Sequence, residues 1–196
     1  HVSLFLVDRE TRRVTMKAES SRYARGERAH GSIDLSQGIV GRAARSGRTV
    51  RVDDVWTEPD YVDWWPDTRS EVAVPVRIGG VVEAVLNVES DVVGAFSEAD
   101  TLVLETAAHQ LAIAMENARL FGRVKESEEE YRTLVESATI GVLQVDTSSR
   151  TVYANPAIGD LTGMDRTTAL SRFASPADLA VPEDRERLAA ELGAAG

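Results

Sequence analysis

A long helical pattern in the middle of the chain constrains the fold most, because it divides the sequence into two parts. From Ser97 to Ala138 there is no proline, and apolar residues recur at helical spacing. The pattern is apolar at first, becomes rich in charge over 122–130, and ends at a strand-like run over 139–146. Helices that close a domain usually end at Gly or Pro and give way to a loop. This pattern therefore predicts a stiff helix that leaves one core and enters another.

Before this helix, the apolar pattern predicts an antiparallel sheet. Five strands are expected, at 2–8, 14–18, 49–52, 71–76 and 81–88. The last two form the clearest hairpin, because Gly79 and Gly80 separate two apolar runs. A short helix is expected over 36–47 and irregular chain over 19–35. Strands in hairpin order with few helices indicate an α+β fold, an antiparallel β-sheet with flanking helices.

After the long helix, a second and smaller α+β segment is expected. Strands are predicted at 139–146 and 151–154, a short helical segment at 155–163, and a helix at 182–196. Gly163 suits the end of the short helix, and Pro182 with the acidic residues behind it suits a helix N-terminus.

Charge and composition exclude several classes of function. The net charge of −10 opposes nucleic-acid binding, which needs a basic surface, and it opposes contact with an anionic membrane. No apolar run approaches the roughly 20 residues of a transmembrane helix. The chain has no cysteine, which excludes disulfides, thiolate metal sites and cysteine nucleophiles. This is compatible with the cytoplasm, where we expect the protein.

Three blocks resemble the core of a GAF domain in their order and spacing. They are "GIVGRAARSGRTVRVDDV", "RSEVAVPVRIGGVVEAVLNVES" and "FSEADTLVLETAAHQLAIAMENARLF". The resemblance covers residues 1–121. It implies a sensor domain whose first helix, expected before the first strand, is missing from this chain.

Three later blocks resemble the first half of a PAS domain. They are "EEEYRTLVESATIGVLQVD", "TVYANPAIGDLTG" and "PEDR". The resemblance assigns 139–196 to a partial PAS-like domain and 122–138 to a signalling linker helix that continues from residue 97. Since three further strands would complete a PAS fold, no PAS ligand is assigned. Together the resemblances imply a bacterial signal-transduction sensor, as in a two-component system. They also imply an output domain beyond residue 196, such as a histidine kinase, cyclase or phosphatase.

The segment 53–69 is the strongest candidate for a binding site. It contains all three tryptophans of the chain and six carboxylates, and in GAF domains this segment forms the lid of the ligand pocket. Aromatic rings beside carboxylates suit a cationic or ring-bearing small molecule. The candidate ligand-binding residues are Trp56, Tyr61, Trp64, Trp65, Arg69 and Ser70. The alternative is that the tryptophans pack on the sheet, the acids are solvated, and Arg69 pairs with one of them.

Neither a cofactor nor a catalytic residue is identified by the sequence. GAF domains that bind bilins covalently or reduce sulfoxides use cysteines, so no covalent bilin is expected. His30 is a candidate haem contact, but a lone loop histidine is more often solvated, so no haem is expected. No metal ligand is predicted, because the 53–67 acids lack calcium-loop spacing. A metal-dependent enzyme built on that acidic loop remains an alternative.

The long helix also carries an apolar spacing that predicts pairing with a second copy. Its members are Leu104, Ala107, Leu111, Ala114, Ala118, Phe121, Val124, Glu128, Tyr131, Val135 and Ala138. Two steps of three fall together around Phe121, which overwinds a coiled coil locally, and Gly122 there is the predicted signalling hinge. We expect a parallel homodimer through helix 97–138, with a solvated helix as the alternative.

The sequence therefore predicts a non-catalytic sensory or regulatory module. It would bind an unidentified small molecule, dimerise, or both, and pass a conformational signal through the helix to an output domain. A dimerisation scaffold with a vestigial, filled pocket is the second hypothesis.

Overall fold

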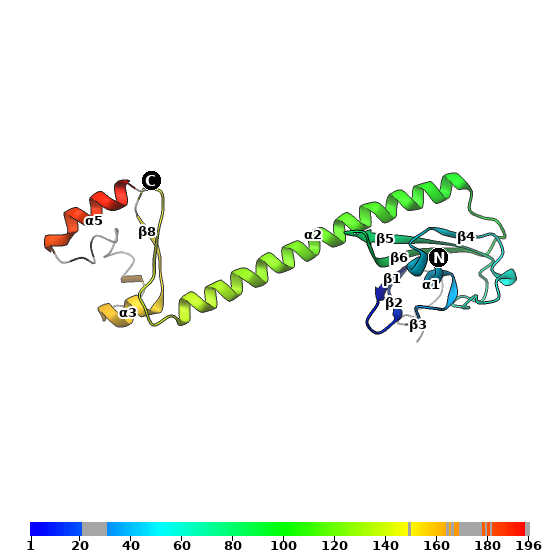
Figure 1. Cartoon of the computed structure of the whole chain (residues 1–196), viewed down its shortest axis with the longest axis horizontal. Coiled ribbons are helices and arrows are strands. Elements are labelled where there is room, and N and C mark those ends of the chain that lie inside the picture. Colours follow the sequence, from blue (N-terminus) through cyan, green and yellow to red (C-terminus); the bar gives the residue numbers. More distant parts are fainter. Residues whose placement is uncertain are drawn as a thin grey trace. The chain divides into compact units, whose positions relative to one another are not determined.

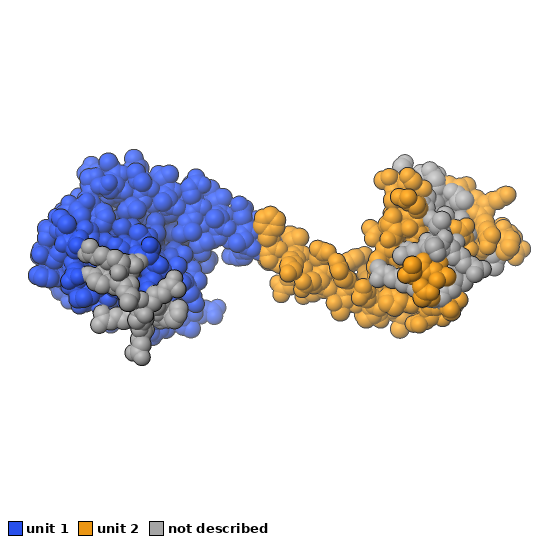
Figure 2. Space-filling model, turned by 180° about the vertical axis from the view of Figure 1, so that it is seen from behind, with its two compact units in different colours: residues 1–120 blue, residues 121–196 orange. Residues whose placement is uncertain are grey.

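Two sheets and one long helix organise the described part of the chain (Figure 1). The computed structural model describes residues 1–20, 31–148, 150–163, 165, 167–168, 178, 180 and 182–194. The chain forms two compact units, His1–Leu120 and Phe121–Gly196 (Figure 2).

The first unit contains a six-stranded antiparallel sheet in the order β3-β2-β1-β6-β5-β4. The strands are β1 (Val2–Asp8), β2 (Arg13–Ser20), β3 (Ser32–Asp34), β4 (Val50–Val52), β5 (Ser70–Ile78) and β6 (Val81–Ser90). With the helices that flank this sheet, the predicted α+β fold class is confirmed.

The sheet has one strand more than the five predicted. β3 pairs with β2 inside the stretch that was expected to be irregular, with Ile33 opposite Val14. Ile33 is buried and both of its neighbours are half-buried. Three residues are too few to show an alternating pattern. The strand is therefore defined by its pairing with β2 and not by its own sequence.

The turn between β5 and β6 forms as predicted. Gly79 and Gly80 have φ angles of 59° and 84°, which glycine adopts readily and which mirror-image hairpin turns require.

Pro75 lies on β5 beyond the end of β4, whose pairing stops at Val50 opposite Ala73. β5 therefore has a free edge at Pro75, as a residue without a backbone N–H requires.

Alternation along the strands builds a core on each face of the sheet. One face carries Phe5 and Val85 and packs against α1 (Gly38–Ser46). The other carries Val74 and Val76 and packs against α2 (Glu98–Ser137). We call them the α1 face and the α2 face.

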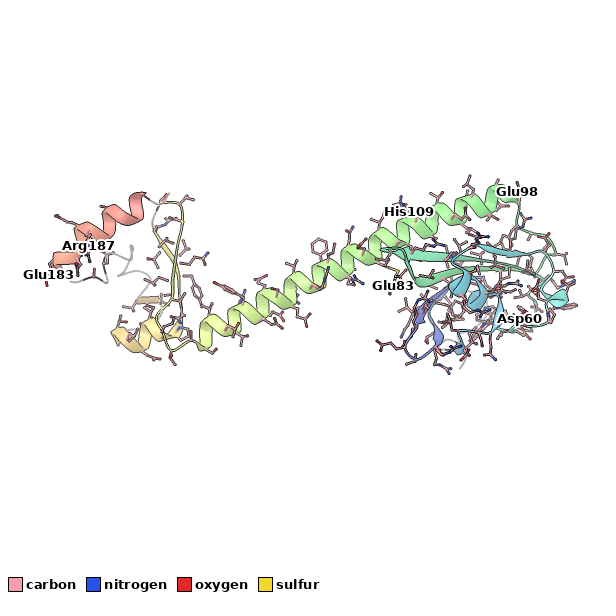
Figure 3. The ribbon with its side chains drawn as sticks, in the orientation of Figure 1. Asp60, Glu83, Glu98, His109, Glu183 and Arg187 are labelled. Carbon is pink, nitrogen blue, oxygen red and sulfur yellow. The ribbon has the colours of Figure 1, made fainter. Side chains whose placement is uncertain are left out.

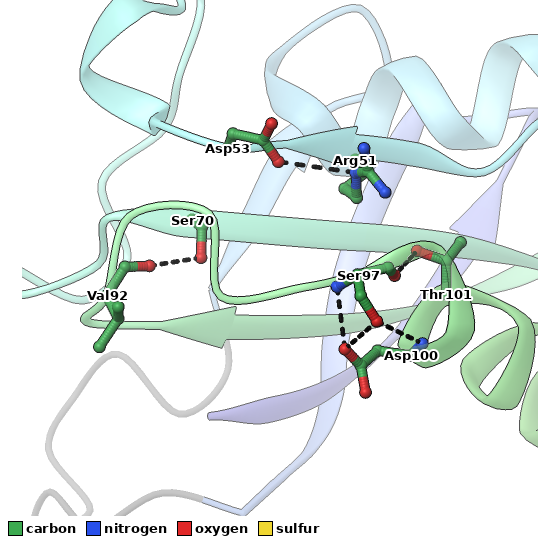
Figure 4. A network of polar contacts seen from close by, with 7 residues as sticks. All are labelled: Arg51, Asp53, Ser70, Val92, Ser97, Asp100 and Thr101. Atoms are coloured by element: carbon green, nitrogen blue, oxygen red, sulfur yellow. Dashed lines mark hydrogen bonds and ion pairs between the residues drawn. The ribbon is translucent and has the colours of Figure 1, made fainter.

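Helix α2 is continuous over 40 residues. Its start is encoded locally, because the Asp100 carboxylate accepts from the Ser97 backbone N–H at 2.8 Å and the Ser97 hydroxyl accepts from the Asp100 N–H at 3.2 Å (Figure 4). This reciprocal cap is the one the sequence favours. The Ser97 hydroxyl also donates to Asp100 at 2.6 Å.

The contacts of α2 with the sheet correct one sequence prediction. The residues of α2 that pack on the sheet are Leu104, Ala108, Leu111, Ala112 and Met115. Leu104 and Leu111 had been assigned to a seam with a second copy. That part of the seam is wrong, because helical spacing alone does not show which of two apolar stripes faces the protein's own sheet.

The second unit contains a two-stranded sheet with helices. It comprises β7 (Leu143–Val145), β8 (Thr151–Ala154), α3 (Pro156–Thr162) and α5 (Pro182–Ala194). Gly163 ends α3 with a φ of 69°, as predicted. Arg187, which is labelled in Figure 3, pairs with Asp184 at 3.0 Å on α5.

Asn155 connects three parts of this unit. Its side-chain amide donates to the Val135 carbonyl at 3.0 Å and to the Ile140 carbonyl at 2.8 Å, and its side-chain oxygen accepts from the Val142 N–H at 2.8 Å. Asn155 is almost completely buried, so these bonds hold the last turn of α2 against the start of α3.

Within the described ranges, no helix is both long enough and apolar enough to cross a membrane.

Candidate ligand-binding site

The segment 53–69 begins with a short 3-10 helix, η2 (Val55–Thr57), whose start is locally encoded. The Asp54 carboxylate accepts a hydrogen bond from the Trp56 N–H at 3.2 Å. Val55 is fully buried in the core of the α1 face. The segment is thus anchored over that face of the sheet.

Arg69 pairs with an acid of this same segment. Its Nη2 lies 3.0 Å from the Asp54 Oδ2, and its guanidinium carbon lies 4.1 Å from the Trp56 ring centroid. The hydrogen bond from Arg69 is the main cause that lowers the pKa of Asp54. The sequence left open whether Arg69 would meet a ligand or a lid acid, and here it meets the acid. Trp56 is 67% exposed and covers the guanidinium from outside.

Trp64 and Tyr61 pack against the core of the α1 face. The Trp64 ring centroid lies 5.8 Å from that of Phe5, with 57° between the planes. Gly31 faces the Trp64 ring so closely that a β-carbon at residue 31 would collide with it. Burial raises the pKa of Tyr61, and the charge of Glu89 raises it further.

Trp65 and Ser70 lie in different surroundings. Trp65 is only 7% exposed, and its ring stacks on His1 with a centroid distance of 4.9 Å. Ser70 is fully buried, and its hydroxyl donates to the Val92 carbonyl at 2.7 Å (Figure 4). By strand alternation Ser70 shares the α2 face with Val72. The structure therefore brings Tyr61 and Trp64 together on the α1 face and leaves Ser70 on the other.

Two buried carboxylates beneath this segment were missed in the sequence. Glu71 on β5 and Glu89 on β6 are opposite each other in the ladder and only 3% and 4% exposed. Asn87 donates its side-chain amide to Glu89 at 2.8 Å, and Thr68 donates its hydroxyl to Glu89 at 2.7 Å. Val72 lies on the α2 face and Ala73 lies on the α1 face. Because side chains alternate along a strand, Glu71 lies on the same α1 face as Ala73, toward the tryptophan segment.

Both buried acids have raised pKa values. Burial raises the pKa of Glu71 well above the ordinary 4.5, and the charge of Glu89 adds to this, while Asn87 and the more distant charge of Arg42 oppose it. Burial also raises the pKa of Glu89, against the hydrogen bond from Thr68. Two like charges in one buried cluster favour a state with fewer charges, or a bound cation. Perturbed acids of this kind mark candidate functional sites.

Two partly buried acids of the segment each pair with an arginine. Glu58 accepts from Arg42 at 2.9 Å, and Asp54 accepts from Arg69, so each has an arginine partner. Across the residues that the structure describes, no three His, Cys, Asp or Glu side chains form a group that could hold a metal ion. His30, considered as a haem contact, lies outside the described residues, and His109 lies on the exposed surface of α2 (Figure 3).

A cavity of about 280 Å³ reaches Glu89. It is lined by His1, Ser20, Glu89, Ser90 and Asp91. The backbone nitrogen of His1 donates to the Glu89 backbone carbonyl at 2.7 Å. The cavity therefore brings one of the two buried acids close to a space that a small molecule could enter.

The sequence did contain one pattern that points to the acid pair. In "SEVAVPV" and "LNVES" the glutamates occupy positions of the apolar alternation, where a solvated side chain is out of place. Their meeting across the ladder depends on the register between β5 and β6, which neither run specifies alone.

Known proteins share the fold of the first unit. A free methionine-R-sulfoxide reductase from Neisseria meningitidis, solved in complex with its substrate, is 29% identical; the match covers 61% of this chain and 68% of that one, with a TM-score of 0.55. The GAF domain of an Acinetobacter phosphoenolpyruvate-protein phosphotransferase is 25% identical over 62% of this chain and 73% of that one, with a TM-score of 0.53.

Part of this chain is also similar in sequence to a known bacterial protein. Protein YtsP of Bacillus subtilis is 30% identical over 83 residues, which are 42% of this chain and about half, 51%, of that protein. GAF and PAS domains are typically sensory or regulatory modules and usually not catalytic, although some GAF relatives, such as the reductase, are enzymes. A PAS fold model matches residues 129–193. The GAF domain model matches residues 1–116, which are more than half of this chain. The chain therefore belongs to the GAF domain family.

Proposed function

We propose that this chain is a non-catalytic sensory module whose GAF domain binds a small organic cation on the α1 face of its sheet. The observation that carries the proposal is the buried pair of Glu71 and Glu89, opposite each other beneath an aromatic segment. A cation beside them would favour both ionised forms, which burial alone opposes. The rings of Tyr61 and Trp64, which pack on that face, would supply the apolar and cation–π contacts that such a ligand needs.

The chemistry of one neighbour supports an ammonium ligand. The reductase that shares this fold acts, by its name, on a free amino acid derivative, and an amino acid carries an ammonium group. Because the present chain has no cysteine, and GAF domains that reduce sulfoxides use cysteines, we propose that it senses such a molecule and does not reduce it.

A homodimer would carry the signal onward. We propose that two copies associate through α2, and that ligand binding in the GAF domain changes this helix and, through it, the PAS unit and an output domain outside the chain. A cytoplasmic location fits this role.

Tryptophan fluorescence tests the ligand proposal directly, because all three tryptophans lie in 56–65. Free amino acids and small amines are titrated into the protein, and we expect at least one to change the emission at saturating concentration. Glu71→Gln and Glu89→Gln should abolish this response. Glu83→Gln, on the same strand β6 (Figure 3), should preserve it. A response that is equal in all four proteins, or absent for every amine, would contradict the proposal.

A scaffold with a filled pocket is the second candidate function. It is favoured by the packing of Trp64 between Phe5 and Gly31, which leaves little room beneath that ring. In this case the dimer would form normally, and none of the amines would change the fluorescence.

A further inference from the structure

The outer side of α2 carries a second apolar repeat that the sheet leaves exposed. The side chains that pack on the sheet lie near Ala108 and Ala112. On the opposite side of the helix, Val103 is 67% and Ile113 is 44% exposed. The sheet therefore uses one stripe of this helix, and the outer stripe has no partner among the described residues.

The outer stripe fits the spacing of a heptad repeat and has apolar residues at seven of its eleven positions. Its members, alternating three and four residues apart, are Val103, Thr106, Gln110, Ile113, Asn117, Leu120, Val124, Ser127, Tyr131, Leu134 and Ala138. We call this set the outer seam. Val103, Asn117 and Val124 fall at a positions, and Ile113, Leu120 and Leu134 at d positions. A regular repeat over five heptads is the spacing of a left-handed coiled coil.

We propose that the outer seam is the surface through which two copies of this chain pair as a parallel coiled coil, with Asn117 fixing the register. The inference rests on the proposed homodimer and specifies its contact surface. In a parallel pair Asn117 meets Asn117 of the second copy, and the two amides can hydrogen-bond. In an antiparallel pair a positions meet d positions, so the amide would face a residue such as Leu120, with its hydrogen bonds unmade.

The charges that border the outer seam agree with parallel pairing. A residue at g of one helix then lies near the following e residue of the other. Arg123 at g would meet Glu128 at e, which have opposite charges. Glu116 at g would meet Phe121 at e, so the exposed Phe121 ring gains a partner. The g and e positions from Leu102 to Val135 bring no two like charges together.

The outer seam differs from the first predicted seam in its relation to Gly122. The earlier spacing needed two steps of three beside this residue, whereas the outer seam passes it with regular steps from Leu120 to Val124. Gly122 then lies at an f position, away from the partner helix. The coiled coil therefore needs no local overwinding there.

Single cysteines test this assignment cleanly, because the chain has none of its own. Leu120→Cys and Val124→Cys should give a disulfide-linked dimer as the main product of mild oxidation. Ala118→Cys is the matched control, since Ala118 is an exposed helix residue on the first predicted seam but at a b position of the outer seam. It should remain uncrosslinked.

Each other outcome overturns part of the argument. If sedimentation shows a dimer while Ala118→Cys crosslinks and Leu120→Cys does not, the outer seam is wrong and the proposed homodimer stands. If the protein is a monomer at all concentrations, the homodimer itself fails.

Asn117→Leu should tighten association and allow larger oligomers or shifted crosslinks, because the amide layer restricts register at a cost in stability. Unchanged association and crosslinks in Asn117→Leu would remove Asn117 from this role.

Discussion

At the scale of single residues, the buried acids Glu71 and Glu89 make the stability of the fold depend on pH. Their pKa values are raised in the folded protein, so the folded state holds more protons than the unfolded state in the affected pH range. The contribution of these groups to the free energy of unfolding is therefore full below about 4.5, the ordinary value, and is lost as pH rises through the raised values. A site that costs stability at neutral pH is expected where binding requires it.

Replacing Glu71 by Gln should stabilise the GAF domain at neutral pH, because it removes one of two like charges that burial disfavours. The gain in unfolding free energy over wild type should be largest near pH 7 and shrink toward pH 4.5. Urea unfolding at several pH values measures it, and each 1 kcal/mol corresponds to roughly 4 °C in Tm. Glu83→Gln should show no such pH-dependent gain. A Glu71→Gln protein that is less stable than wild type at pH 7 would contradict the assignment.

The individual residues also show where prediction from sequence stops. The aromatic segment was found because its unusual composition is local, and Arg69 was correctly linked to a lid acid as one of two alternatives. The contact of Glu71 with Glu89 was not found, because it depends on strand register across 18 positions of sequence. Ser70 was placed in the site because it opens the next strand, but by strand alternation its side chain lies on the α2 face.

At the scale of elements, α2 is the part of the fold that the sequence determines best. The capping pair of Ser97 and Asp100 and the absence of proline are local properties, and both are present in the helix. The apolar pattern was less informative, since the helix carries one stripe for the sheet and another on its outer side. Deciding between them requires the tertiary contact of residues such as Leu111 with β5 and β6.

Gly122 gives a prediction for this element. A methyl group at Gly122 would meet nothing within 4 Å, so Gly122→Ala should stabilise the helix by about 1 kcal/mol. Slower amide hydrogen exchange over 118–126 would show it. Gly47→Ala is the contrasting variant, because Gly47 has a φ of 61° and faces the Arg77 guanidinium, and it should destabilise the GAF domain. Unchanged exchange in Gly122→Ala would mean that this glycine does not limit the stability of α2.

Asn155 gives a second prediction, for the connection of α2 with the PAS unit. Asn155→Ala removes three hydrogen bonds and leaves the Val142 N–H without this partner, which should cost about 1–3 kcal/mol. Amide exchange should become faster around Val135 and Val142 and stay unchanged in β5. Gln144→Ala, on the exposed side of β7, is the control and should change neither. Equal effects of the two variants would show that Asn155 is not a special contact.

At the scale of the whole molecule, the chain divides into two units between Leu120 and Phe121, inside α2, and the sequence predicted that the linker helix begins after residue 121. The GAF domain model ends at residue 116, and the PAS fold model begins at residue 129. A helix that runs through such a boundary preserves the angular phase of its seam, which a flexible linker would lose. This is the physical reason to expect signalling through a rod.

The phase of the rod is testable by insertion after Lys125. Seven residues restore the outer seam beyond the insertion, so Leu134→Cys should still crosslink between two copies. Two residues turn Leu134 by about 200° (two steps of 100°) and move it from a d to an f position of the outer seam, so its crosslink should weaken strongly. Leu120→Cys, which precedes the insertion, should crosslink equally in both proteins and serves as the internal control. If Leu134→Cys crosslinks equally after both insertions, α2 does not pair continuously across Lys125, and it cannot pass a rotation from the GAF domain to the PAS unit.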